Sequence, residues 1–196
     1  MTPSNAPAGV DRSPAAAWSL RVRRVGGFIQ LAFAAFWLIR GSLAIGGPVG
    51  IDLAAVLGAT AIAVAGYGIR VTAGVAPRPT GPVAGRIERE ITIATIIQLV
   101  ASFVAPAVVI AAGRGAWALP SIAITIGPLL LWLDHRVGIR RYRLVGWALI
   151  VGPVLLAAAL SGTALTATTG IGAGLLLLAT AAAGFHDLAV VPRARG

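Results

Sequence analysis

Residues 91–112 read ITIATIIQLVASFVAPAVVIAA and contain no charged side chain. As an α-helix this stretch would be about 33 Å long, enough to cross the roughly 30 Å hydrocarbon core of a bilayer. Backbone groups in lipid must bond to one another, so a spanning segment is either a helix or a strand of a closed barrel. Barrel strands alternate apolar and polar side chains, and this stretch does not. It therefore predicts a transmembrane helix.

Five further apolar stretches of similar length lie along the chain: residues 25–45, 51–71, 116–133, 144–160 and 166–185. The composition agrees, with 58% apolar and 11% charged residues and a mean hydropathy of +0.90, whereas a soluble domain carries about 25% charged residues. The predicted fold class is all-α, a polytopic membrane protein with six transmembrane helices arranged as three helical hairpins. Residues 1–24 are predicted as a disordered or surface-lying tail, 25–189 as the transmembrane domain and 190–196 as a second tail.

The basic residues predict the orientation of the chain. All 16 are arginines, and all but Arg40 and Arg114 lie in the tails or in the loops after the second and fourth stretches. Arginine-rich loops stay in the cytoplasm, so we expect a protein of the bacterial inner (plasma) membrane with both termini cytoplasmic. The net charge of +10 then reflects topology, and no nucleic-acid partner is expected, since that needs a basic groove along phosphates. The expected partners are the lipid bilayer and a second copy or another membrane protein.

The sequence offers little for catalysis. It has no cysteine and no lysine, which excludes disulfides, thiolate ligands and Schiff bases. It also has no nucleophile elbow, zinc-protease helix or phosphate-binding Gly-Lys loop. His135 and His186 each neighbour an aspartate. The two histidines could ligate haem or a metal, or each could be a cation that interacts with the dipole at a helix end, and we favour the second interpretation. We therefore expect no catalytic residue, cofactor or metal, and predict a non-enzymatic bundle that binds lipid, a small molecule or another membrane protein.

The third predicted helix carries a stripe of polar side chains on one face: Glu88, Thr92, Thr95, Gln98 and Ser102. At 100° per residue these positions fall within an arc of roughly 120°. Such a stripe lines a solvated cavity or bonds helix to helix away from lipid, and we favour packing against other helices. In the alternative function, a small transporter or channel, the path uses this stripe and Arg40.

Arg40 is the most anomalous charge in the sequence. Only uncharged residues separate it from the arginines at residues 21–24, so it should lie beneath the outer surface, where an unpaired arginine is costly. Asp52 lies at similar depth beyond the Gly-Gly-Pro turn at residues 46–48. We expect an ion pair between Arg40 and Asp52, with an anion site or a snorkelling Arg40 as the alternatives.

Small residues and prolines predict how the helices pack. Gly170 and Gly174 form a small-xxx-small face on the sixth helix, which permits close packing within the bundle or across a dimer. Pro106, Pro128 and Pro153 each fall inside an apolar stretch, where proline removes a backbone hydrogen bond and kinks the helix.

Two resemblances accompany these patterns. The three-hairpin layout and the segment from Gly41 to Pro48 are similar to the bacterial acid-resistance membrane family built from repeated two-helix units. Residues 120–127, with Tyr142 and Gly146, look like a family of uncharacterised six-helix bacterial membrane proteins. That family tends to continue with a His-Phe-Leu-Pro-like segment, whereas residues 128–131 are Pro-Leu-Leu-Leu here, so any role of such a histidine is missing. Neither resemblance implies an activity.

Reporter fusions test the predicted orientation. A cytoplasm-active reporter at the C-terminus should be active and a periplasm-active reporter inactive, because the arginine bias keeps that end inside. The opposite pattern would contradict both the orientation and the even number of spans.

Overall fold

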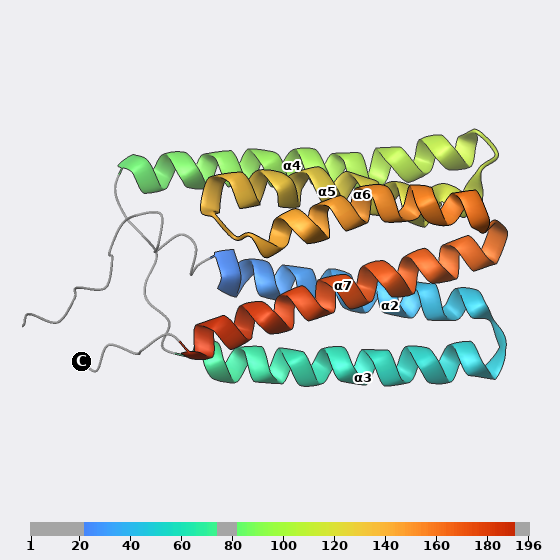
Figure 1. Cartoon of the computed structure of the whole chain (residues 1–196), viewed down its shortest axis with the longest axis horizontal. Coiled ribbons are helices and arrows are strands. Elements are labelled where there is room, and N and C mark those ends of the chain that lie inside the picture. The colour runs from blue at the N-terminus through green and yellow to red at the C-terminus, as the bar shows by residue number, and fades with distance from the viewer. Residues whose placement is uncertain (1–21, 74–81, 191–196) are drawn as a thin grey trace, which may run out of the picture.

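The computed structural model describes residues 22–73 and 82–190. Within these ranges there is no strand, and six helices are long and apolar enough to cross a membrane (Figure 1). They are α2 (Gly27–Ile45), α3 (Gly47–Thr72), α4 (Pro82–Ala111), α5 (Ala118–Val137), α6 (Arg141–Ala159) and α7 (Gly162–Val190). A π-helical turn, η1 (Val22–Gly26), precedes α2, and a 3-10 turn, η2 (Gly115–Trp117), precedes α5. The prediction of an all-α bundle with six spans is confirmed: the chain is a multi-pass membrane protein.

Several helices extend beyond their apolar stretches. The fourth helix, α4, begins at Pro82 rather than at Ile91, since proline suits the first turn of a helix, where its missing N–H has no partner to lose. The charged residues that follow continue the helix outside the hydrocarbon. Of the predicted N-terminal tail, residues 22–24 belong to η1, and residues 1–21 lie outside the described part, as do residues 191–196 of the C-terminal tail.

The two ends of the bundle differ in their connections and charge. At one end, Gly46 and Gly47 have φ angles of 78° and 61°, a region that glycine enters without a steric penalty, and they reverse the chain between α2 and α3. The other end, called the arginine-rich end below, carries most of the described arginines: Arg23, Arg24, Arg70, Arg86, Arg89, Arg136, Arg140, Arg141 and Arg143.

The six helices pack as two groups of three. Helices α2, α3 and α7 contact one another, while α5 lies between α4 and α6 in the second group. The groups meet where α7 packs against α5 and α6, and α3 and α4 lie at opposite edges of the molecule (Figure 1). The chain therefore runs as three hairpins, but the third hairpin, α6–α7, is divided between the two groups. Prolines 106, 128 and 153 lie inside α4, α5 and α6, each of which continues past its proline.

The most extensive interface joins the first and last spanning helices, α2 and α7. A Cβ on Gly170 would lie 2.6 Å from the Cα of Gly41, and a Cβ on Gly41 would lie 2.6 Å from the backbone nitrogen of Ile171. A Cβ on Gly174 would lie 2.6 Å from Cγ of Leu38. The two glycines of the small-xxx-small face thus pack within the bundle, where close backbone approach supplies the van der Waals contact that holds helices together in lipid.

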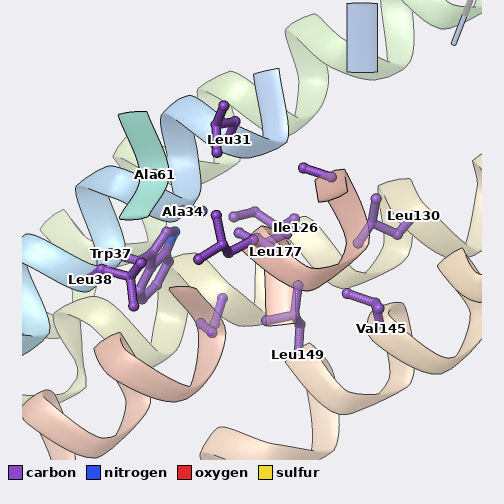
Figure 2. Packing of buried hydrophobic residues seen from close by; sticks show 14 of the residues in the cluster. Leu31, Ala34, Trp37, Leu38, Ala61, Ile126, Leu130, Val145, Leu149 and Leu177 are labelled. Carbon is purple, nitrogen blue, oxygen red and sulfur yellow. The ribbon is translucent and has the colours of Figure 1, made fainter. Parts of the chain in front are cut away.

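Large apolar side chains fill the space around this crossing. Trp37 and Leu38 of α2 are fully buried, and Figure 2 shows them near Leu177 of α7, with Leu149 of α6 on the far side of the cluster. Towards the arginine-rich end, Phe185 is fully buried and touches Phe28, with ring centroids 4.9 Å apart. The core is therefore centred on α7, which contributes the most buried side chains, with α2, α5 and α6 packed around it.

A glycine pair tests the crossing. Gly170→Ala should lower the free energy of unfolding by about 1–3 kcal/mol, because the added methyl group meets backbone that has no room to move. Gly172→Ala is the matched control, since nothing lies within 4 Å of its Cβ position, and it should not lower stability. Thermal unfolding in detergent, followed by tryptophan fluorescence, measures both. Equal effects of the two substitutions would contradict the close crossing.

Candidate functional site

A cavity of about 290 Å³ lies between the two helix groups near the arginine-rich end. Helices α2 and α4 form its two sides, although they do not pack against each other, and α5, α6 and α7 form its floor. Most of the lining is apolar and comes from five elements, η1, α2, α4, α5 and α7: Val25, Gly26, Ile29, Phe33, Ile91, Leu99, Ile126, Leu129, Leu130, Leu133 and Leu177. We call this space the α2–α4 cavity.

The polar stripe of the third helix lies on one wall of this cavity. Glu88, Thr92, Thr95 and Gln98 all line it. Gln98 is buried, whereas both threonines are exposed. The fifth stripe residue, Ser102, lies one turn beyond the cavity. The stripe therefore serves both of the roles weighed from the sequence, lining a cavity over most of its length and packing at one end.

Hydrogen bonds at the deep end of the stripe connect α4 to α5. Nε2 of Gln98 donates to Oγ of Ser102 over 2.7 Å, and that hydroxyl lies 3.0 Å from Oγ1 of Thr125 on α5. Thr125 in turn donates to the backbone oxygen of Ile122 over 2.8 Å. Because α4 packs extensively only against α5 and η2 among the described elements, these bonds hold it in apolar surroundings where few other polar partners exist.

The opposite wall contributes a polar pair that the sequence reasoning missed. Gln30 of α2 and Tyr142 of α6 are both buried and line the cavity, and their side chains lie close enough to interact. The signal was present, since Gln30 is the only polar aliphatic side chain between Val25 and Ile39. A buried amide without a partner costs free energy, so a single glutamine in such a stretch indicates a partner on another helix.

An ion cluster next to the cavity joins three helix ends. Nη1 of Arg23 lies 2.8 Å from Oδ2 of Asp187, and Arg141 also bonds that oxygen. These residues come from η1, α6 and the last turns of α7. The side chains are only 23–38% exposed, so screening by water is reduced. The cluster fixes the start of α6, and with it Tyr142, against α2 and α7.

Two more ion pairs occur at the same end. Nε of Arg143 lies 2.8 Å from Oδ2 of Asp134, whose side chain is 5% exposed. Arg136 bonds Glu90 at one end of a wider, more open groove of about 790 Å³ between α4 and α5. That groove and the α2–α4 cavity share Gln98 as a lining residue.

The structure does not bring Arg40 and Asp52 together. Both side chains are exposed, and no ion pair or hydrogen bond joins them. The seam between α2 and α3 runs through Ser42 and Gly50, where a Cβ on Gly50 would lie 2.6 Å from the Ser42 oxygen. Arg40 and Asp52 are each two residues from this seam, which turns them by about 200° around their helices. Similar depth in the membrane therefore does not bring the two charges together, because each residue lies on a helix face that turns away from the seam between α2 and α3.

The two histidines lie at the arginine-rich end, where both side chains are exposed. No group of three or more histidine, cysteine, aspartate or glutamate side chains able to hold a metal occurs in the part of the chain that the structure describes.

Double-mutant cycles separate the real ion cluster from the expected one. Arg141→Ala and Asp187→Asn should couple by about 0.5–3 kcal/mol in the free energy of unfolding, because they share a partly buried bond. Arg40→Ala and Asp52→Asn should be additive. Unfolding in detergent measures both cycles, and coupling found only for Arg40 with Asp52 would refute the assignment.

The sequence matches no protein-family model, no curated protein and no solved structure. The α2–α4 cavity and its lining residues are therefore the basis for the function proposed below.

Proposed function

We propose that this membrane protein binds an amphiphilic molecule, such as a lipid or a small molecule with an apolar tail, in the α2–α4 cavity. One observation carries the proposal: the polar stripe on α4 faces largely apolar walls from α2, α5 and α7 in a single cavity. Small-molecule sites are mostly apolar with a few placed polar groups. A polar stripe that faces apolar walls suits a ligand with one polar and one apolar part.

The surroundings of the cavity support access from the bilayer. The helices on its two sides, α2 and α4, are not packed together, and the lining residues Val25 and Ile29 are 46% and 49% exposed. The volume of about 290 Å³ is at the lower end of the roughly 300–1,000 Å³ usual for ligand sites. The cavity would then hold one part of an amphiphile while the remainder stays among lipid chains.

The depth of the cavity favours ligand binding over transport across the membrane. From Glu88 to Gln98 the polar stripe extends about 15 Å along α4, which is roughly half the thickness of the hydrocarbon core. Beyond it, Gln98 bonds Ser102, and the hydrogen bond between Ser102 and Thr125 joins α4 to α5. The alternative, a transporter or channel, needs a route onward to Arg40, and Arg40 lines neither of the two cavities described above.

The arginine distribution supports the location of the site. The arginine-rich end is proposed to be cytoplasmic, in a bacterial inner membrane, because arginine is retained on that side. The α2–α4 cavity then faces the inner leaflet, with its mouth near the cytoplasmic lipid head groups.

A blocking substitution tests the proposal. Thr95→Trp places a large side chain in the cavity and should reduce the amount of co-purified amphiphile, measured by native mass spectrometry after mild detergent release, by at least several-fold. Ile96→Trp is the matched control, because Ile96 is 55% exposed and lines neither cavity. Retention of the same amphiphile by both variants and the unaltered protein would contradict binding in this cavity.

A further inference from the structure

The hydroxyl protons on the α4 wall of the cavity are already used within the helix. Oγ1 of Thr92 donates to the backbone oxygen of Glu88 over 2.9 Å, and Oγ1 of Thr95 donates to that of Ile91 over 2.8 Å. A hydroxyl has one proton and two lone pairs. Each threonine therefore presents acceptor capacity to the cavity, and donating to a ligand would break its bond to the helix.

Gln98 extends this pattern at the deep end of the cavity. Its Nε2 donates to Ser102 over 2.7 Å, while its carbonyl oxygen accepts no hydrogen bond from the described residues. Across the cavity, the side chains of Gln30 and Tyr142 lie close to each other. A ligand reaching between the walls thus meets a row of oxygen acceptors on α4.

We propose that the polar part of the bound amphiphile is a hydrogen-bond donor, either a hydroxyl or a protonated amine, which donates to Thr92, Thr95 and Gln98 of α4. This inference rests on the proposed function and adds the chemical class of the ligand. The apolar part of the ligand lies against Ile126, Leu130 and the other apolar lining residues.

An anionic head group does not fit the same wall. Phosphates and carboxylates need donors, typically arginine, and no arginine lines the α2–α4 cavity. Arg23 and Arg141 of the ion cluster both bond Asp187, and neither lines the cavity.

Four probes with the same twelve-carbon chain separate head-group donation from charge. Dodecylamine donates and is charged, dodecanol donates and is neutral, dodecyltrimethylammonium is charged without a donor, and dodecanoate is an anionic acceptor. Binding is measured by calorimetry on the protein in nanodiscs, with empty nanodiscs subtracted. We expect dodecylamine, dodecanol or both to bind about tenfold more tightly than the other two. Tighter binding of dodecanoate, or dodecyltrimethylammonium equal to the best donor, would overturn the proposal.

Valine substitutions test whether Thr92 and Thr95 accept the hydrogen bonds that the ligand donates. Thr92→Val with Thr95→Val keeps the shape of the wall and removes both acceptors, so it should weaken donor probes about two- to tenfold for each bond lost and leave dodecyltrimethylammonium unchanged. Thr60→Val is the matched control, because Thr60 makes the same bond to its own helix, to the Val56 oxygen over 2.9 Å, on α3. Unchanged affinity of donor probes in the double variant would overturn the donor assignment while leaving the proposed function intact. Failure of all four probes to bind would instead refute the proposed function, and with it this inference.

Discussion

The contact on which the rest of the structure depends is the backbone approach of α2 to α7 at Gly41 and Gly170. Lipid gives helices no hydrophobic reason to associate, so close packing and polar bonds must supply the attraction. Without side chains at these two positions, the backbones of the first and last spanning helices meet directly, and these two helices share the most extensive interface in the described part of the chain. Helix α3 packs against both of them, and α7 alone among these three makes the main contacts with α5 and α6.

The α2–α4 cavity follows from that arrangement. Because α2 is committed to α7 and α3, it leaves α4 without a partner on that side, and α4 packs against α5 instead. The stripe on α4 then has two environments along its length. Ser102 and Gln98 bond towards α5, while Thr92 and Thr95 face the open space. A single helix face thus supplies both the attachment of α4 and the polar wall of the proposed binding site.

The polar groups around the cavity divide into those that hold the protein and those that remain open to a ligand. In the cluster of Arg23, Arg141 and Asp187, two guanidinium groups share one carboxylate and fix three helix ends. Gln30 and Tyr142 lie close together on the opposite side of the cavity. The oxygens of the α4 threonines and of Gln98 keep unused acceptor capacity. The unused acceptor capacity on α4 is the physical reason for proposing a ligand that donates hydrogen bonds.

The sequence by itself determined the six spanning helices, their approximate limits and the face of the third helix that carries polar groups, because these depend on local hydropathy and on helical periodicity. It also indicated that Gly170 and Gly174 would permit close packing. Only the tertiary structure decided that these glycines meet Gly41, that Gln30 finds Tyr142, and that Asp187 takes two arginines, since those pairs lie on helices far apart in the chain. The expected pair of Arg40 and Asp52 shows why: depth follows from counting residues, but whether two side chains meet depends on the rotation of each helix about its axis, and that rotation is set by packing.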